Sequence, residues 1–455
     1  MAVDRSWALT AIASACMALA SPTLSGSLLF FVGVTCWAHA TASNSSAHFG
    51  KHFVVCLLWQ LGQISWFYTT WRDFSGSSPF FPFLCLWTLQ LWPPLLTALL
   101  ASTLAHRRWP ISAAWGVAWT AGEVLCALQP IPLTPSLWST DWTLWVWLGA
   151  LGGRAILSGG CVAVALLLTT HWRAAVGLSI CALIPAFVHR QDDHGTALTV
   201  GIVQTNLDPF NGRTMSQWPQ QAEQLATLIT STEAQVIVTP EGAWPFPIRS
   251  SAERKSLPSS WTVPTVLGVN LDAHNSLALV LNGQVSDTID KERLVPLAER
   301  KWLGFGKERY QPGNGERVFT VNGARVGGLI CYEDAHPRPV SNASKQGAEW
   351  LLAATNDGWL GPSRGADLHL AASRLAAIES RLWLVRPTTT GYSAVVSPTG
   401  DVVWRSAWDV TGPGTTHAQA IFTRRVRFAG ASCYPWPSLI AGIAAMFGLF
   451  SRRLR

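Results

Sequence analysis

Charged residues are distributed so unevenly along this chain that they divide it into two parts. The chain has 33 Lys or Arg and 26 Asp or Glu among 455 residues, and only twelve of these 59 lie in residues 1–190. A stretch with so few charges cannot present a charged surface to water, whereas apolar segments of roughly 20 residues can span a bilayer. We therefore predict a membrane domain followed by a soluble domain.

Seven apolar segments of the first part approach the length of a membrane span. They lie near residues 7–20, 25–40, 52–71, 80–104, 110–128, 150–169 and 174–189, and an eighth lies at 434–450 before a basic tail. The first two could instead form one helical hairpin, and the first also has features of a signal peptide. We predict a transmembrane domain of about seven spans at 1–190 and a C-terminal transmembrane helix with a cytoplasmic tail at 434–455.

Basic residues in short loops indicate which side of the membrane is cytoplasmic. If the N-terminus lies in the cytoplasm, the loops on the other side of the membrane contain few basic residues. The loops on the inner side carry Arg5, Lys51, Arg107, Arg108, Arg173 and the tail, and the outer loops carry Arg72, Arg154 and Arg190. This pattern predicts that residues 191–433 lie outside the cytoplasm.

Composition excludes several classes of protein. The net charge of +7 comes from the membrane part and the tail, since the 22 basic residues between them are balanced by 22 acidic ones. Without a basic patch we expect no nucleic-acid partner. Seven of the nine cysteines lie inside apolar stretches and none forms a CxxC pair. We therefore expect no disulfide framework, metal site or cofactor.

From about residue 197 short β-type runs alternate with polar or helical stretches. Two segments, 218–231 and 366–381, have apolar residues three and four apart, which is typical of helices. The predicted strands are 197–206, 234–242, 262–270, 276–283, 325–333, 350–357, 382–388 and 392–400. Strands with intervening helices predict a layered α/β domain around one core.

Three strands lead into residues with reactive side chains, namely Glu241, Lys291 and Cys331. Loops at strand ends converge over one edge of a sheet. A carboxylate can deprotonate a thiol, and an ammonium can stabilise an oxyanion, so these three residues suit acyl transfer. Taken singly, each has a plainer interpretation: a buried small cysteine, a turn glutamate and a lysine in a solvated charge run. A Cys/His pair using His336 or His369 is a further alternative.

Several short motifs in a fixed order carry a resemblance to a known family. PEGAWPFP, DKERLVPLAE, LICYE and ATNDGWLG precede AAIESRLWLVRPTTTGYSAVVSPTGD. The chain thereby resembles the carbon-nitrogen hydrolase (nitrilase) superfamily. With spans before and after the domain, the whole chain resembles the apolipoprotein N-acyltransferases. The conjugal-transfer TraB-type branch of the same superfamily is similar too.

The resemblance implies a nitrilase-like αββα sandwich with a Glu-Lys-Cys triad. The triad falls on Glu241, Lys291 and Cys331, and the auxiliary positions fall on Glu299, Tyr332 and Glu333. It implies a membrane-bound thiol acyltransferase that takes a fatty acyl chain from a phospholipid donor and passes it to the N-terminal amine of a diacylglyceryl lipoprotein acceptor. A membrane-tethered amidase and a conjugal-transfer accessory protein are the alternatives.

The chain departs from the acyltransferase pattern at several positions. It has Thr239 where Trp is usual, Leu297-Ala298 where Phe-Gly is usual, and Thr389 where Asn is usual; Ala376 replaces an Arg, and a Lys-Trp pair is missing from 204–215. A further residue, Glu123, falls in a predicted span, where a carboxylate is costly and faces a cavity or a partner. A contact with a lipid head group and an interfacial position are the two interpretations.

Overall fold

The computed structural model describes residues 5–42, 48–75, 78–177, 179, 196–207, 215–301, 308–408 and 412–422. These residues fall into two compact units, one within 1–190 and the other within 191–427. The predicted spans at 174–189, for the most part, and at 434–450 lie outside the described residues.

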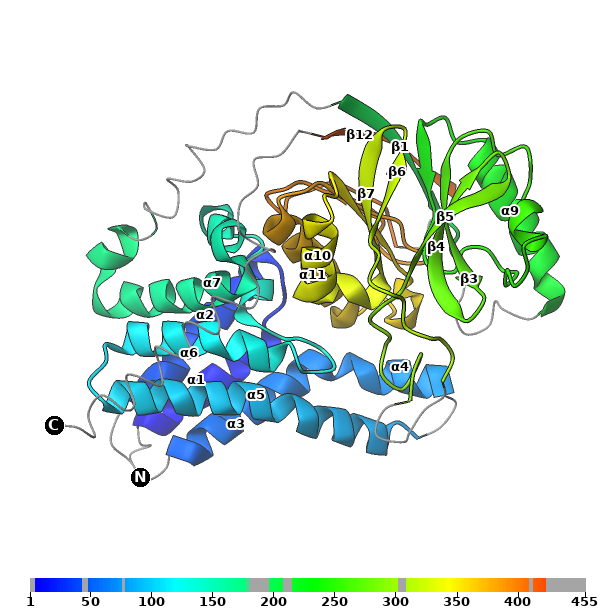
Figure 1. Cartoon of the computed structure of the whole chain (residues 1–455). Helices are drawn as coiled ribbons and strands as arrows, with labels where there is room; N and C mark the ends of the chain where they lie inside the picture. The colour runs from blue at the N-terminus through cyan, green and yellow to red at the C-terminus, as the bar shows by residue number, and fades with distance from the viewer. Residues whose placement is uncertain are drawn as a thin grey trace. The chain divides into compact units, whose positions relative to one another are not determined.

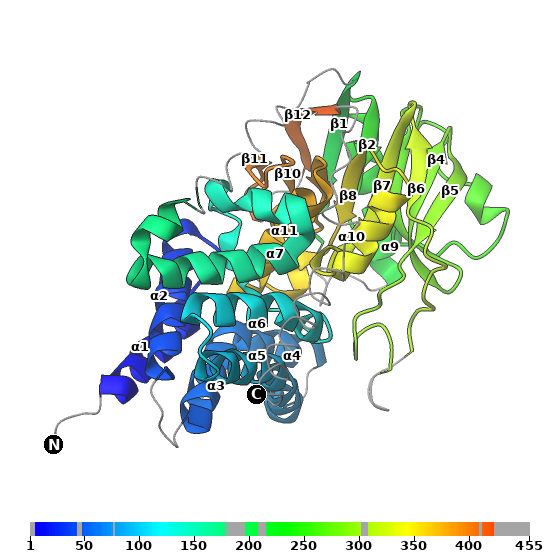
Figure 2. The same ribbon diagram turned by 60° about the vertical axis from the view of Figure 1, so that its left-hand side comes forward.

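The first unit is a bundle of helices (Figures 1 and 2). Neighbouring helices along the chain pack side by side, as α1 does with α2, α5 with α6 and α6 with α7. The helices are α1 (Arg5–Leu19), α2 (Leu24–Ala40), α3 (His48–Ile64), α4 (Trp66–Ser75), α5 (Phe80–His106), α6 (Ile111–Cys126) and α7 (Thr143–Thr170).

Two of the described helices are long and apolar enough to cross a membrane: Phe80–His106, and Leu148–Thr170 within α7. A third apolar stretch, Ser25–Ala40, is shorter. A helical N-terminal unit is therefore established, whereas the membrane domain of about seven spans stays a prediction.

Two basic residues that were predicted to lie in loops lie inside helices. Lys51 is in the first turn of α3, where its Nζ donates to Ser6 Oγ at 2.7 Å. Arg154 follows a bend in α7 at Gly152 and Gly153 and is buried. Arg154 therefore lies in a helix directly after the glycine bend rather than in a loop, and its side of the membrane stays a prediction.

The carboxylate of Glu123 is buried within the helical unit rather than exposed at a helix end. It lies near the end of α6, and Ser158 Oγ of α7 donates to its Oε2 at 2.9 Å. The carboxylate thus faces a partner inside the bundle, which is neither the lipid-head contact nor the interfacial position that the sequence suggested.

The second unit has two six-stranded sheets. The first has the order β12-β1-β2-β3-β4-β5 and the second β11-β10-β9-β8-β7-β6. The strands are β1 (Thr196–Gln204), β2 (Val236–Val238), β3 (Thr265–Leu271), β4 (His274–Leu281), β5 (Gln284–Asp290), β6 (Val318–Val321), β7 (Ala324–Ile330), β8 (Trp350–Ala354), β9 (Leu384–Arg386), β10 (Ala394–Val396), β11 (Val402–Arg405) and β12 (Gly412–Phe422). The eight strands with predicted bounds are present, β5 is the strand that was expected directly before Lys291, and β6, β11 and β12 are in addition.

The two sheets pack face to face through one apolar core. Side chains such as Val200 and Val238 of the first sheet share this core with Val326 and Leu352 of the second. Helix α9 (Trp218–Thr230) covers the outer face of the first sheet through Leu225. Helices α10 (Pro337–Lys345) and α11 (Arg364–Ser380) cover the second sheet (Figure 1). The predicted αββα sandwich is confirmed.

Central strands of both sheets are buried on both faces because helices and the opposite sheet cover them. Every residue of β2 and of β8 is buried, whereas the edge strand β11 alternates between half-buried and exposed positions. This explains why the central strands appear in the sequence as continuous apolar runs rather than as alternating ones.

Candidate active site

Glu241 lies three residues beyond the end of β2, in a turn that is held close to β3. Thr239 Oγ1 accepts a hydrogen bond from the Gly268 N–H at 2.9 Å and donates to Val266 O at 3.3 Å. The absence of a side chain at Gly268 lets the Pro240 carbonyl approach, since a Cβ there would lie 1.9 Å from Pro240 O. Thr239, one of the departures from the family pattern, thus anchors the turn that carries Glu241.

Lys291 sits between two carboxylates directly after β5. Its Nζ lies 2.9 Å from Oε1 of Glu241 and 2.9 Å from Oε1 of Glu299, and its side chain is 1% exposed. Asn275 Nδ2, from β4, donates to the same two oxygens at 2.7 and 3.0 Å. The second oxygen of Glu299 accepts the Val295 N–H at 2.7 Å. Lys291 is therefore a fixed, buried ammonium, and the solvated charge run is excluded for it.

Cys331 directly follows β7 and is the first residue of a short 3-10 helix, Cys331–Ala335, which forms the turn after the strand. Its φ is +50°, a left-handed conformation that costs a non-glycine residue roughly 1–2 kcal/mol. The side chain is partly exposed, and its thiol is among the groups that lower the pKa of Glu241. The structure thus brings Glu241, Lys291 and Cys331 together, with Glu299 beside the lysine.

The charges of this cluster follow from burial and mutual contact. Burial by itself would raise the pKa of Glu241, but the charge of Lys291 and hydrogen bonds from Lys291, Asn275 and Cys331 hold it below the usual value. Burial would lower the pKa of Lys291, but Glu241 and Glu299 raise it well above the usual value. Burial and the charge of Glu241 raise the pKa of Cys331. At neutral pH the cluster therefore holds a carboxylate, an ammonium and a neutral thiol.

Glu333 is fully buried and joins the turn of Cys331 to the segment after Lys291. Its oxygens accept N–H groups of Ile330 at 2.9 Å, Glu292 at 2.8 Å and Arg293 at 3.0 Å. Arg317 contacts the same carboxylate with two nitrogens, at 2.6 and 2.7 Å. Glu333 therefore binds protein groups on all sides and fixes the distance between the two reactive segments.

Tyr332 packs between two neighbouring side chains. Its ring contacts His336 with centroids 4.4 Å apart, and the Arg293 guanidinium lies 5.9 Å from the ring centre. Burial raises the pKa of the tyrosine hydroxyl. His336 thus contacts an aromatic ring, which gives no support to its use as the base of a Cys/His pair.

Some residues of this site were not anticipated from the sequence. Asn275 could have been noticed as a polar residue at the start of an otherwise apolar strand. Arg317 has no such signal, because a lone arginine before a strand is usually exposed. Thr389, a departure from the family pattern, lies at the site, where its hydroxyl is 3.4 Å from the Glu241 carbonyl. The region of the missing Lys-Trp pair lies partly outside the described residues.

Several curated proteins are similar to this chain over most of its length. The apolipoprotein N-acyltransferase of Thermosynechococcus vestitus is 28% identical over 464 residues, which cover 90% of this chain and 88% of that protein. The apolipoprotein N-acyltransferase of Gloeobacter violaceus is 27% identical and covers 88% and 84%. That of Ralstonia nicotianae is 28% identical and covers 80% and 76%.

Similarity to solved structures and to a family model covers the second unit. A crystal structure of a carbon-nitrogen hydrolase from Helicobacter pylori G27 is 17% identical, covers 48% of this chain and 88% of that chain, and has a TM-score of 0.38. The carbon-nitrogen hydrolase family model matches residues 199–427. Because this match takes in half of the chain, including Glu241, Lys291 and Cys331, the chain belongs to the carbon-nitrogen hydrolase family.

Proposed function

We propose that this protein is a membrane-bound thiol N-acyltransferase that transfers a fatty acyl chain to the N-terminal amine of lipoproteins. The observation that carries the proposal is the cluster of Glu241, Lys291 and Cys331, in which the half-buried Glu241 carboxylate is ion-paired to Lys291 and the Cys331 thiol is among the groups that lower the pKa of Glu241. The similarity to apolipoprotein N-acyltransferases over most of both chains supports the choice of an amine, rather than water, as acceptor.

In the first half-reaction Glu241 takes the thiol proton while Cys331 Sγ attacks the ester carbonyl of a phospholipid. The new S–C bond forms, the ester C–O bond breaks, and the proton passes from Glu241 to the departing lysophospholipid oxygen. In the second half-reaction the lipoprotein amine attacks the thioester, the C–N bond forms and the C–S bond breaks. The amine proton passes through Glu241 to the sulfur, which restores the thiol.

Lys291 stabilises the oxyanion of each tetrahedral intermediate, together with a backbone N–H near Tyr332. An ammonium fixed by two carboxylates needs little rearrangement when negative charge develops near it. Glu299 positions this lysine through its 2.9 Å contact with Nζ, and its second oxygen is held by a backbone N–H. Tyr332 and Glu333 support the turn that presents Cys331.

The same proposal includes the location of the enzyme and its partners. Residues 1–190 anchor the chain in the inner membrane through several spans, residues 191–433 form the catalytic domain on its outer face, and residues 434–455 return to the cytoplasm. Two lipid-held substrates and a tethered enzyme meet in one surface layer, which raises their effective concentrations.

The test is to trap the acyl-enzyme. Purified protein incubated with phospholipid and no amine acceptor should gain one fatty-acyl increment in intact-protein mass spectrometry, and neutral hydroxylamine should remove it. Cys331→Ser should abolish the increment while thermal melting stays nearly unchanged, because one atom of a partly exposed side chain changes. An increment that persists in this variant at another thiol, such as Cys161, or no increment in the parent protein, contradicts the proposal.

The acceptor is tested separately from the nucleophile. The gene should restore growth to a strain depleted of its own lipoprotein N-acyltransferase. A thioester that forms but is lost quickly in buffer without an amine, together with failed complementation, would favour the membrane-tethered amidase.

A further inference from the structure

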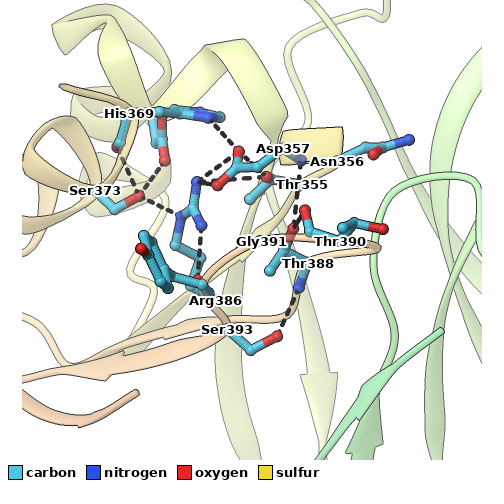
Figure 3. Close-up of polar contacts among 12 residues, drawn as sticks. Thr355, Asn356, Asp357, His369, Ser373, Arg386, Thr388, Thr390, Gly391 and Ser393 are labelled. Atoms are coloured by element: carbon cyan, nitrogen blue, oxygen red, sulfur yellow. Dashed lines mark hydrogen bonds and ion pairs between the residues drawn. The ribbon is translucent and has the colours of Figure 1, made fainter. Parts of the chain in front are cut away.

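A second group of charged side chains includes Asp334, which belongs to the short helix that begins at Cys331. Asp334, Asp357 and Arg386 are fully buried, and His369 is 10% exposed. His369 Nε2 lies 3.1 Å from Asp334 Oδ1, and its Nδ1 lies 2.7 Å from Asp357 Oδ1. Figure 3 shows His369 bonded to Asp357, with the Arg386 guanidinium between Asp357 and Ser373. Both ring nitrogens of the histidine therefore face carboxylates.

The charges of this group balance only when the histidine is protonated. The rest of the group consists of two buried carboxylates and one guanidinium, and a nitrogen of the Arg386 guanidinium lies 2.9 Å from Asp357 Oδ2. Burial by itself would lower the pKa of His369, but Asp334 and Asp357 outweigh burial and the nearby Arg386 and raise the pKa to about 10. An imidazolium whose Nδ1 is hydrogen-bonded to Asp357 and whose Nε2 lies 3.1 Å from Asp334 has no lone pair with which to accept a proton. The pairing of Cys331 with His369 as its base is thereby excluded.

The group connects four elements of the second sheet and its helices. Asp334 lies three residues after Cys331 in the same short helix, and Asp357 follows β8. His369 is on α11, and Arg386 ends β9. Ser373 Oγ of α11 also donates to Asp334 Oδ2. The position of the turn that carries Cys331 is therefore set partly by its attachment to α11.

We propose that His369 is a positioning residue for Cys331: a permanent imidazolium that bridges Asp334 and Asp357 and fixes the nucleophile turn against the end of β8. It exchanges no proton during the reaction. The inference rests on the proposed role of Cys331 as a nucleophile. Its test is therefore the reactivity of the thiol toward a small alkylating agent, a measurement that is independent of which acyl donor or acceptor the enzyme uses.

The decisive experiment compares His369→Gln with the double variant His369→Gln/Asp334→Asn. The single variant leaves two carboxylates against one guanidinium, so the turn should loosen. The double variant restores neutrality and keeps an amide pair able to link the same elements. We expect alkylation of Cys331 by iodoacetamide, followed in the full-length protein in detergent, to slow about 10- to 100-fold in the single variant and to recover largely in the double variant.

A matched control separates this effect from the loss of any ion pair. Arg254→Gln removes an exposed contact with Asp272, 2.7 Å long, and should leave the alkylation rate unchanged. An unchanged rate in His369→Gln, or a double variant no faster than the single one, overturns the proposal. The alkylation rate of the parent protein should also show no step near pH 6.5. If such a step is present in the parent and missing from the double variant, His369 titrates, and the proposal is overturned.

The pH dependence of the melting temperature provides a second test, which does not require that the single variant His369→Gln can be purified in a folded form. A histidine whose pKa is raised on folding stabilises fully below its unfolded pKa, and this contribution is lost as the pH rises toward the folded value. Because the folded pKa is about 10, the melting temperature of the parent protein should fall more between pH 7 and pH 10 than that of the double variant. Parallel curves for the two proteins would contradict a charged His369.

Discussion

Glu241 combines two roles at the residue scale, and one substitution separates them. Its carboxylate makes an ion pair with Lys291, and in the proposed mechanism it also takes the proton of Cys331. Glu241→Gln keeps the size and the hydrogen bond from Lys291 but removes the proton affinity. We expect acyl-enzyme formation to slow about 10²- to 10⁴-fold, the usual effect of losing a general base.

Rapid-quench mass spectrometry of the first half-reaction checks this expectation, with thermal melting as the control for folding. Lys291 keeps its contact with Glu299 in the variant, so its ammonium stays in place. A nearly normal rate would mean that another group activates Cys331.

The three residues that are proposed to react were easier to single out in the sequence than the residues that hold them in place. Glu241 and Cys331 follow buried strands, so strand ends alone indicated where they would meet. Arg317 and Asp357 were not anticipated, although Asp357 also follows a strand. Their roles depend on contacts between elements that are far apart in the chain. A short-range sequence pattern does not indicate which charged residue will be the partner of a buried charge.

At the scale of elements, a close contact between β3 and the turn after β2 sets the position of Glu241. Gly268→Ala would place a Cβ 1.9 Å from Pro240 O, so the peptide that leads into Glu241 must move. A displacement of about 1 Å near a catalytic group can cost roughly 10²-fold in rate. We expect acyl-enzyme formation to fall by this order although no reactive side chain has changed.

The matched control is Gly201→Ala on β1 in the same sheet. Its Cβ would lie 2.5 Å from Thr232 Cγ2, so it crowds the sheet at a position away from the turn of Glu241. Both variants should lower the melting temperature, since overpacking typically costs about 1–3 kcal/mol. Only Gly268→Ala should lose activity, and equal activities in the two variants would contradict this account.

Elements that the sequence did not predict have weak local patterns for physical reasons. Strand β11 (Val402–Arg405) is a short edge strand, and β6 (Val318–Val321) has only four residues. Helix α10 (Pro337–Lys345) has few apolar residues and begins with two prolines in its first three positions. Such segments adopt their structure because long strands beside them offer a surface, which short-range periodicity cannot show.

Contacts within the helical unit gather its basic residues at one end. Lys51 of α3 contacts Ser6 at the start of α1, and His48 of α3 stacks edge-on against His106 at the end of α5. The end of α2 meets the end of α7 through His39 and Thr169, with 3.0 Å between their side chains. Arg5, Lys51, Arg107, Arg108 and Arg173 therefore lie at or next to helix ends on the same side of this unit, an arrangement that supports the proposed cytoplasmic placement.

The proposed topology predicts that two exposed positions differ in their accessibility to a reagent outside the cell. Ser251 is exposed in the second unit, and Arg108 is exposed between α5 and α6. In intact spheroplasts a membrane-impermeant maleimide should label Ser251→Cys above the level of the parent chain. It should label Arg108→Cys only after the membrane is permeabilised, because the proposed topology puts that residue in the cytoplasm. The parent chain accounts for its own nine cysteines. Labelling of Arg108→Cys but not of Ser251→Cys in intact spheroplasts would put Cys331 in the cytoplasm, out of reach of an acceptor on the outer face, and would refute the lipoprotein acyltransferase while leaving the thiol chemistry itself intact.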